Sequence, residues 1–436
     1  MSLTSVSRLY ARGLAPGEAR LRDFQDRRLR AVLTSAAESV PYFRELFRRA
    51  DVDPAQVRGA EELPVIPVST KDDLRRWPES ERIVAEHRRL IRRMTNGSSG
   101  TPFGVLRTPE EEFTLSLLRE LAQVRSGALP WDRRATLLES SFAGGRLLPA
   151  RFAARVGLFR LHRLDPQMPR EKLAAHLIGL APEVVMGYAS VVANLALSLA
   201  ERAPTWRPRV VFAGGETLDD AARTRIDAAF RASVCNLYAS AECNLLASDC
   251  PQGAKTMHIC DEGVVLEVIH KGRPAAVGEA GNVVATALHS SAMPFIRYDT
   301  GDQAVRGPQP CPCGWPGTTL LSVEGRVIET FRLPGGRWLH PVSIVAAIAA
   351  AEQGWVDEHR LVQEEEDLVA IQLVPLHEPP DRKLDEIYTR ASRVLGPAVR
   401  LRVELVDRVP AEPGRKRRPF ISRVSEQAAG AREPDA

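Results

Sequence analysis

The chain has 436 residues, of which 44% are hydrophobic and 26% are charged, and its formal net charge is +4. This length exceeds what one compact core accommodates, so two or more domains are expected. The basic residues are dispersed and no aromatic-interleaved basic patch occurs, which argues against nucleic acid as a partner. No apolar run approaches the roughly 18 residues of a membrane span, and the first residues lack the apolar core of a signal peptide, so we expect a cytoplasmic protein without a membrane partner.

The N-terminal part of the chain is expected to be helical. Residues 17–50 carry apolar residues at helical spacing and end in an amphipathic turn that begins with a proline. A proline-containing segment at 61–77 follows, in which Ser69 and Thr70 precede Lys71 in the manner of a helix N-cap. A short helix is therefore predicted to begin at about Lys71.

A loop rich in glycine and hydroxyl side chains lies at residues 95–102, with the sequence TNGSSGTP. Its glycines permit close approach of the backbone, and its serine and threonine hydroxyls are neutral hydrogen-bond donors. Such a loop is either an ordinary turn or a cradle for phosphate oxygens, and its residues alone leave both interpretations open.

From about residue 134, strands and helices are expected to alternate. The runs ATLLES, PEVVMG, PRVVFAGG and SVCNLY are strand-like, whereas residues 189–202 and 218–231 have helical spacing. This alternation predicts a parallel sheet with helices on its faces. Because ligands bind beyond the carboxyl ends of such strands, segments 214–216 and 238–242 are expected at the functional edge.

The pattern becomes antiparallel from about residue 263, where GVVLEVI and GNVVATAL are joined by a turn-rich segment and followed by PFIRY. A helix–strand–strand–helix–strand order then fits the C-terminal residues. We therefore predict an α/β fold with a large domain, residues 1–325, in which mixed and parallel sheets are flanked by helices. It includes a β-rich subdomain at about 245–322. A small mobile α+β domain, residues 326–436, completes the chain.

All six cysteines lie in one stretch of the second half of the chain. In a long cytoplasmic chain such cysteines favour metal binding or plain burial over disulfides. Cys250 with His258, and Cys311 with Cys313, offer the four ligands of an ordinary structural zinc site. Cys260 competes for one ligand position, and simple burial of the thiols is the alternative.

Six motifs follow one another along the chain, namely TNGSSGTP at 95–102, AGGETL at 213–218, NLYASAE at 236–242, FIRYDTGD at 295–302, EGR at 324–326 and PGRKRRPFIS at 413–422. With this set the chain resembles the adenylate-forming superfamily and, within it, the phenylacetate–CoA ligase-like branch. The resemblance covers nearly the whole chain. It favours the phosphate-cradle interpretation of the first motif and implies a hinge at the predicted domain boundary. A Cys/His set like the one above recurs in part of this branch.

The resemblance implies a role for most residues in these motifs. ATP would be bound by Ser98, Ser99, Gly100, Thr101, Ala213, Gly214, Gly215, Glu216, Asn236, Tyr238, Ser240, Asp302 and Arg326. In this set Tyr238 would stack on adenine and Asp302 would accept the ribose hydroxyls. Glu242 would hold Mg²⁺, because a hard cation prefers carboxylate oxygen. Lys416 would enter the active site and stabilise charge in the transition state, with Arg415 as the competing cation.

The chain also departs from the family pattern. Thr101 stands where many relatives have a lysine, so Mg²⁺, arginines or the C-terminal domain must meet the charge of pyrophosphate. Ala239 and Ala241 replace the usual glycine and serine or threonine, and Ile328 stands where an acidic hinge residue is usual. These changes bear on turnover and domain movement more than on the fold.

The implied function is that of an acid–CoA ligase that forms an acyl-AMP from ATP and an aryl or arylalkyl acid. The expected cofactors are ATP, Mg²⁺, CoA and a structural Zn²⁺. Transfer of the acyl group to a carrier-protein thiol or to an amine is one alternative, and a degenerate, non-catalytic nucleotide-binding homologue is another. The identity of the acid is not readable from the sequence, and a homodimer is left open.

Overall fold

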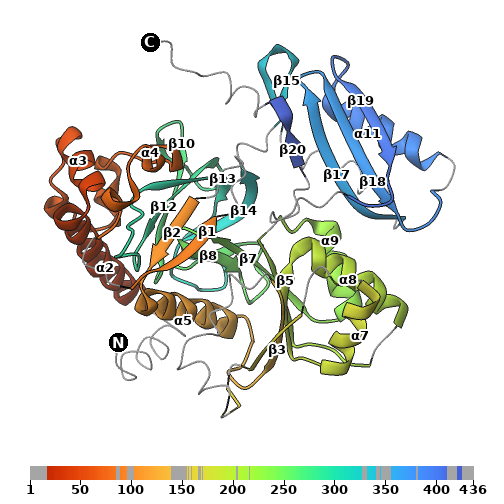
Figure 1. Ribbon diagram of the computed structural model, residues 1–436, viewed down its shortest axis with the longest axis horizontal. Helices are drawn as coiled ribbons and strands as arrows, with labels where there is room; N and C mark the ends of the chain where they lie inside the picture. Colours follow the sequence, from red (N-terminus) through yellow and green to blue (C-terminus); the bar gives the residue numbers. More distant parts are fainter. Residues whose placement is uncertain are drawn as a thin grey trace. The chain divides into compact units, whose positions relative to one another are not determined.

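The computed structural model describes residues 17–84, 89–95, 103–138, 155, 157, 158, 160–164, 168, 170–202, 205–215, 217–326, 331–339, 344, 355–379, 382–409 and 420–424. The described residues form two compact units, of which the first ends at Val323 and the second begins at Glu324 (Figure 1). The sequence analysis puts the boundary between residues 325 and 326, and the assignment of functions to the two parts stays a prediction.

The described helices of the first unit are α2 (Glu18–Ser39), α3 (Pro41–Arg49), α4 (Lys71–Arg75), α5 (Pro109–Arg125), α7 (Arg170–Leu180), α8 (Ala189–Arg202) and α9 (Asp220–Phe230). Of these helices, α3, α4, α5 and α9 begin at a proline or a capping side chain. The side chain of Thr70 caps α4 by accepting a hydrogen bond from the backbone N–H of Asp73 at 3.1 Å. The backbone N–H of Thr70 in turn donates to Oδ2 of Asp73 at 3.0 Å. Short 3₁₀ turns at Pro54–Gln56, Ala60–Val65 and Glu79–Glu81 connect these helices.

The strands up to the end of the first unit are β1 (Ile91–Thr95), β2 (Phe103–Arg107), β3 (Arg133–Leu137), β4 (Arg160–Arg163), β5 (Val184–Tyr188), β6 (Val210–Gly214), β7 (Ser233–Ser240), β8 (Asn244–Asp249), β9 (Met257–Ile259), β10 (Val264–His270), β11 (Arg273–Pro274), β12 (Ala280–Ala287), β13 (Tyr298–Arg306) and β14 (Thr319–Arg326). Within the described residues, twelve of them form one sheet in the order β11-β10-β12-β13-β14-β9-β8-β7-β6-β5-β3-β4. β1 and β2 pair separately as an antiparallel hairpin.

The large sheet joins a parallel half to an antiparallel half. β3, β4, β5, β6 and β7 pair in parallel, as their alternation with helices predicts. β7 then pairs antiparallel with β8, so the antiparallel region begins earlier than the sequence pattern indicates. The mixed α/β fold class is therefore confirmed, and the β-rich part continues the parallel strands in the same sheet.

Helices α7, α8 and α9 cover the parallel half through an apolar interface. Leu177, Leu195 and Ile226 of these helices pack with Val185 and Val211 of the sheet, and all five side chains are at most 1% exposed. Burying each such side chain contributes about 1.5–3 kcal/mol. This interface makes the carboxyl ends of the strands a firm support for loops.

The second unit is a smaller sheet with one described long helix. Its elements are β15 (Phe331–Leu333), a 3₁₀ turn (Pro334–Gly336), β16 (Arg337–Leu339), β17 (Val356–Glu365), β18 (Leu368–Pro375), α11 (Lys383–Leu395), β19 (Arg400–Leu405) and β20 (Phe420–Ser422). The sheet has the order β19-β18-β17-β20, with β17 and β18 antiparallel and the outer strands parallel to their neighbours. The strand–strand–helix–strand order matches the expectation, whereas the helix expected before it falls largely outside the described residues.

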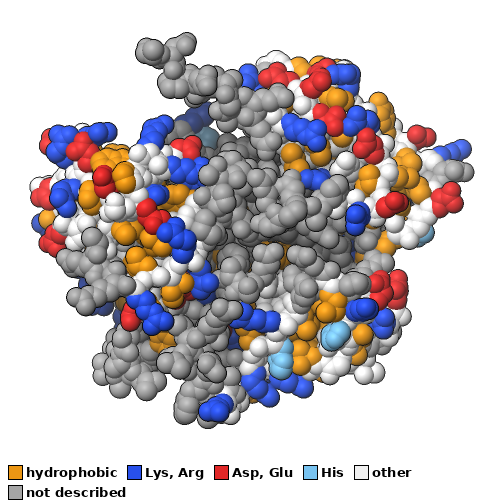
Figure 2. Space-filling view, in the orientation of Figure 1, with side chains coloured by type: hydrophobic (Ala, Val, Ile, Leu, Met, Phe, Trp, Pro, Cys, Tyr) orange, Lys and Arg blue, Asp and Glu red, His pale blue; other side chains and the backbone are white. Residues whose placement is uncertain are grey.

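Basic and acidic side chains lie interspersed over the face of the described residues shown in Figure 2. This distribution agrees with the composition, in which 59 Lys and Arg nearly balance 55 Asp and Glu. Among the described helices, none combines the length and apolar character needed to cross a bilayer.

Candidate functional site

The carboxyl ends of β6 and β7 meet at one edge of the sheet because the two strands run parallel. Ala213 lies opposite Asn236 in this pairing, and Gly214 lies opposite Leu237. A Cβ atom on Gly214 would approach the carbonyl oxygen of Leu237 to 2.5 Å, so this close approach requires glycine. The two segments that the resemblance assigns to adenine are therefore neighbours at this edge.

Tyr238 and Asp302 come together although they belong to different motifs. The hydroxyl of Tyr238 donates to Oδ2 of Asp302 at 2.7 Å. Asp302 lies on β13 and is only 6% exposed. Its backbone N–H donates to the hydroxyl of Thr300 at 3.2 Å, which fixes the turn Thr300–Asp302 that includes Gly301 at φ +71°. The expected adenine and ribose residues thus lie within one hydrogen bond of each other.

Glu242 lies in the turn between β7 and β8 and is buried, with 4% exposure. Its Oε1 accepts a hydrogen bond from the hydroxyl of Tyr298 at 2.9 Å. The same oxygen lies 3.2 Å from Nζ of Lys71. In this turn the hydroxyl of Ser240 accepts from the backbone N–H of Cys243 at 3.0 Å, which helps to set its shape.

Lys71 was not identified as a site residue from the sequence. It reaches Glu242 because the segment before α4 docks on β13: the N–H of Ser69 donates to the carbonyl of Arg297, and the N–H of Asp299 donates to the carbonyl of Ser69, both at 2.9 Å. Two signals could have found it. Lysine is rare in this arginine-rich chain, and the phosphate loop lacks a lysine of its own.

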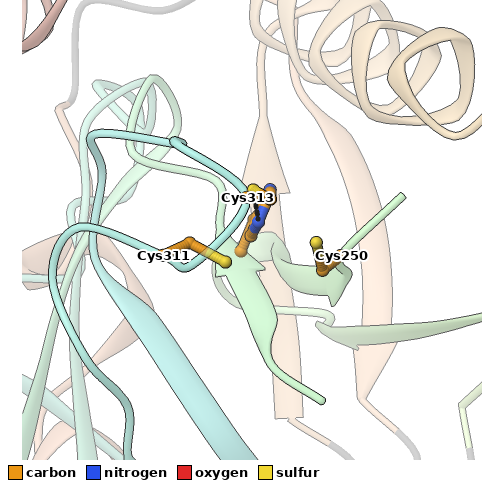
Figure 3. Close-up of side chains that lie close together, drawn as sticks. Cys250, Cys311 and Cys313 are labelled. Carbon is orange, nitrogen blue, oxygen red and sulfur yellow. Dashed lines mark hydrogen bonds between the residues drawn. The ribbon is translucent and has the colours of Figure 1, made fainter. Parts of the chain in front are cut away.

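The four expected zinc ligands form one cluster (Figure 3). The ligand atoms of Cys250, His258, Cys311 and Cys313 all lie within 4.8 Å of one another. Cys250 follows β8, His258 lies on β9, and the two other cysteines lie in the connection between β13 and β14. Sγ of Cys313 is 3.3 Å from Nε2 of His258. The pairing of β8, β9 and β14 therefore brings the two halves of the ligand set together.

The surroundings of the cluster suit a metal-binding histidine. Burial, together with the nearby positive charge of Arg125, lowers the pKa of His258 to about 4. The imidazole is therefore neutral at neutral pH, the form that binds a metal. Trp315 stacks on the ring of His258, with the centroids 5.2 Å apart, and limits its rotation. Cys260 instead lies in an apolar cluster with Leu115 and its neighbours, outside the ligand set.

Several expected site residues fall outside the described part of the chain. They are Ser98, Ser99, Gly100, Thr101, Glu216, Ile328, Arg415 and Lys416, and of Arg326 only the backbone is described.

The hairpin that carries the expected phosphate loop is described, and its strands pair up to Thr95 opposite Phe103. Gly215 follows β6 at φ +74°, and the backbone N–H of Asn236 donates to Oδ2 of Asp249 at 2.9 Å.

Comparison with known proteins connects this arrangement to one group of ligases. No protein-family model matches the chain. The chain is 27% identical over 348 residues to a phenylacetate-coenzyme A ligase of Thermus thermophilus, covering 76% of each chain. A phenylacetate-coenzyme A ligase of Escherichia coli is 27% identical over 293 residues, covering 65% of this chain and 66% of that one. The chain is similar to these phenylacetate-coenzyme A ligases, and its solved structural neighbours are acyl-CoA ligases of the adenylate-forming superfamily.

Solved structures of adenylate-forming ligases have the same fold. A 2-hydroxyisobutyryl-CoA ligase in its postadenylation state with 2-HIB-AMP is 22% identical, with a TM-score of 0.76 over 96% of this chain and 93% of that chain. An anthranilate CoA ligase in complex with anthranoyl-AMP is 16% identical, with a TM-score of 0.56 over 83% of this chain and 70% of that chain. The similarity to relatives named phenylacetate-coenzyme A ligase supports an AMP-forming acid–thiol ligase.

Proposed function

We propose that the chain activates an aryl or arylalkyl carboxylic acid with ATP and transfers the acyl group to CoA. A carboxylate oxygen attacks the α-phosphorus, the bond from that phosphorus to the bridging oxygen breaks, and acyl-AMP and pyrophosphate form. The thiol sulfur of CoA then attacks the acyl carbon and loses its proton, and AMP leaves with the electron pair of the carbon–oxygen bond. Relatives named phenylacetate-coenzyme A ligase support this substrate class.

The proposal rests on one strand, β13, that contacts two groups of expected ATP-binding residues. β13 carries Tyr298, which contacts Glu242, and Asp302, which contacts Tyr238. The first group lies where the phosphates are expected, and the second where adenosine is expected. Tyr298, Glu242 and Asp302 are buried and Tyr238 is partly buried, and Tyr238 and Glu242 lie at and just after the end of β7, at the edge that ligands use in α/β sheets.

Each of these residues would bind a different part of Mg²⁺–ATP. The carboxylate of Asp302 would accept hydrogen bonds from the ribose hydroxyls, and the ring of Tyr238 would lie against adenine. Glu242 would hold Mg²⁺, which when bound neutralises charge on the phosphates. Lys71, at 3.2 Å from Glu242, would add the positive charge that Thr101 cannot supply.

The test is exchange of labelled pyrophosphate into ATP across a panel of aryl, arylalkyl, alkyl and amino acids. Acid-dependent exchange with aryl or arylalkyl acids, followed by formation of a CoA thioester, is the expected result. Exchange without thioester formation would direct the second step to a carrier-protein thiol or an amine. If ATP neither binds nor exchanges with any acid, the chain is a non-catalytic homologue.

We further propose that the Cys/His cluster holds a structural Zn²⁺. Ligand atoms in a tetrahedral zinc shell lie about 3.3–3.8 Å apart, and all four ligand atoms here lie within 4.8 Å of one another. Three thiols and one neutral imidazole fill the four positions, so the ion would have no open site for water or substrate. It would join β8, β9 and the connection that follows β13.

A further inference from the structure

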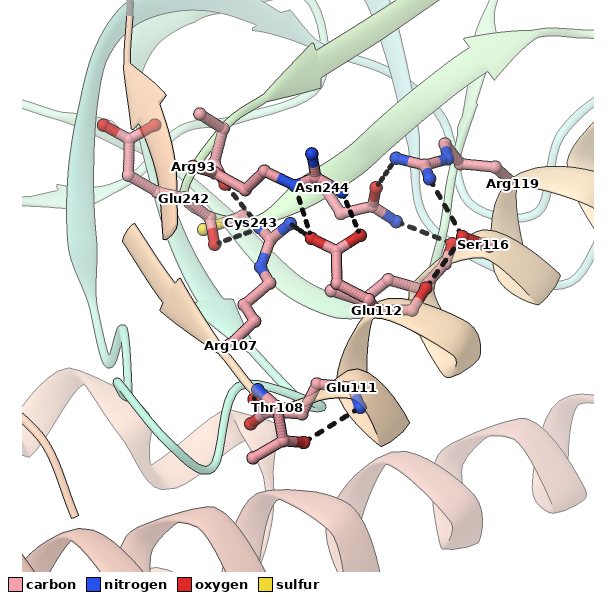
Figure 4. A network of polar contacts seen from close by, with 12 residues as sticks. Arg93, Arg107, Thr108, Glu111, Glu112, Ser116, Arg119, Glu242, Cys243 and Asn244 are labelled. Carbon is pink, nitrogen blue, oxygen red and sulfur yellow. Dashed lines mark hydrogen bonds and ion pairs between the residues drawn. The ribbon is translucent and has the colours of Figure 1, made fainter. Parts of the chain in front are cut away.

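A polar network links the turn that carries Glu242 to the hairpin that carries the phosphate loop (Figure 4). Arg107, the last residue of β2, is only 4% exposed. Its Nη2 donates to the carbonyl oxygen of Ala241 and, at 3.2 Å, to that of Glu242. The guanidinium is therefore hydrogen-bonded to the main chain of the turn that carries the Glu242 side chain.

The position of the Arg107 guanidinium is in turn fixed by Glu112 of α5. Oε1 of Glu112 accepts from Nη1 of Arg107 at 3.4 Å and from Nε of Arg93 at 2.9 Å, and its Oε2 accepts from Nη2 of Arg93 at 3.2 Å. The side chains of Glu112 and Arg107 are each 5% exposed. Turning Arg107 away would remove one of the two arginines that pair with the buried Glu112 carboxylate and would separate the buried Arg107 guanidinium from its counter-ion, so this position is preferred.

A second arginine, Arg119 of α5, holds the other end of the same turn. Nη1 of Arg119 donates to the side-chain oxygen of Asn244 at 2.7 Å, and the amide of Asn244 donates to the carbonyl of Leu115 at 3.0 Å. Asn244 adopts φ +68°, a left-handed conformation that asparagine tolerates. The residues between β7 and β8 are therefore held from the α5 side at both ends.

We propose that Arg107 is a positioning residue that sets the location of the Glu242 carboxylate relative to the phosphate hairpin, and thereby the affinity for Mg²⁺–ATP. The inference rests on the proposed function, because it takes Glu242 as the Mg²⁺ ligand. A purely structural ion pair would need only Glu112, whereas Nη2 of Arg107 is directed to the two carbonyls of the Glu242 turn. Groups that orient a metal ligand typically change metal affinity by about 10- to 100-fold when removed.

The experiment measures binding of ATP by calorimetry without any acid substrate, in the presence and absence of Mg²⁺, so that no turnover contributes. Wild type should bind ATP more tightly with Mg²⁺. Arg107→Met should lose about 10- to 100-fold of that gain while Mg²⁺-free binding stays nearly unchanged, and Arg107→Lys should recover part of it. Arg125→Met is the matched control, because Arg125 is a largely buried arginine at the end of α5 that pairs with buried Glu262 instead of the turn.

Three outcomes overturn the inference: a full Mg²⁺ gain in Arg107→Met, an equal loss in Arg125→Met, or a loss of the same size with and without Mg²⁺. Glu242→Gln should abolish the gain, and adding Arg107→Met to it should cost nothing further, because both act through one carboxylate. If Arg107→Met does not fold, Arg107→Lys, which keeps the charge but not the planar fork, takes its place in the same comparison. A wild-type chain that binds ATP equally with and without Mg²⁺ overturns the role of Glu242 and that of Arg107 with it, whereas an intact gain with an unaffected Arg107→Met refutes the positioning role alone.

Discussion

Lys71 lies 3.2 Å from the Glu242 carboxylate, and its side chain is 21% exposed. Since Thr101 replaces the lysine of many relatives in the phosphate loop, Lys71 is the described lysine placed to meet phosphate charge. Lys71→Met should lower the rate of ATP–pyrophosphate exchange by about 10²- to 10³-fold, the range for removing one preorganised charge. Thermal stability should fall as well, because Lys71→Met removes the charged partner of the buried Glu242 carboxylate.

The matched control for this prediction is Lys172→Met, which removes an exposed lysine from α7. Steady-state exchange rates for both variants and for Lys71→Arg decide the matter. An unchanged rate in Lys71→Met would show that another cation meets the phosphates.

The ion pairs between α5 and the β1–β2 hairpin should make stability depend on pH. Burial alone would raise the pKa of Glu112, but the hydrogen bond from Arg93 and the charge of Arg107 outweigh burial and lower that pKa below its ordinary value. A carboxyl group whose pKa is lower in the folded than in the unfolded chain stabilises the fold above its unfolded pKa of about 4.3. This contribution is lost as the pH falls through the folded value.

Glu112→Gln should therefore lower the free energy of unfolding by about 3–5 kcal/mol at pH 7, the usual cost of removing one partner of a buried pair. The difference from wild type should shrink as the pH falls toward 4 and below. Urea unfolding at several pH values measures it, with Glu61→Gln, whose side chain is 86% exposed, as the control. A difference that grows at low pH would contradict the assignment.

The Cys/His cluster is connected to the expected nucleotide site, because the connection with Cys311 and Cys313 follows directly after β13, which carries Asp302. We expect about one zinc per chain by elemental analysis, and a lower melting temperature after combined Cys311→Ser and Cys313→Ser. Asp302 lies on β13, so the double variant should also bind ATP more weakly.

Cys235→Ser is the control for the zinc prediction, since Cys235 is buried outside the cluster. Burial raises the pKa of its thiol to about 12, as expected for an inert buried cysteine. Purified protein that contains no metal and melts at the same temperature as the double variant would show that the four side chains are ordinary core residues.

Across the whole molecule, the chemistry is expected to need both units. Lys416 precedes β20, which pairs in parallel with β17 in the second unit. Lys416→Ala should lower adenylation by about 10²- to 10³-fold, with a much smaller change in ATP affinity because the first unit is expected to carry most nucleotide contacts. Exchange rates and equilibrium binding separate the two effects. Arg415→Ala is the comparison, and an equal loss there with a near-normal Lys416→Ala would assign the role to Arg415.

Local patterns predicted the alternating strands and helices and the grouping of the four Cys/His side chains, because periodicity and ligand chemistry are visible in short stretches. They could not predict that Lys71 meets Glu242, since that contact depends on Ser69 docking against Tyr298 from a distant part of the chain. Arg107 was missed for a similar reason: a single arginine at a strand end carries no signal until the facing turn is known. The start of the antiparallel region was placed late because β8 is a short, buried strand without clear alternation.

A single strand, β13, sets the distance between the two residue groups of the expected nucleotide site. Tyr298 and Asp302 are four residues apart on β13, so their backbones are separated by at most about 13 Å at the usual rise per residue. Insertions in the surrounding loops would leave this separation unchanged, whereas deletion of one residue between them would turn one of the two side chains to the opposite face. Length variation among related chains should therefore accumulate in the surrounding loops, while β13 keeps its length.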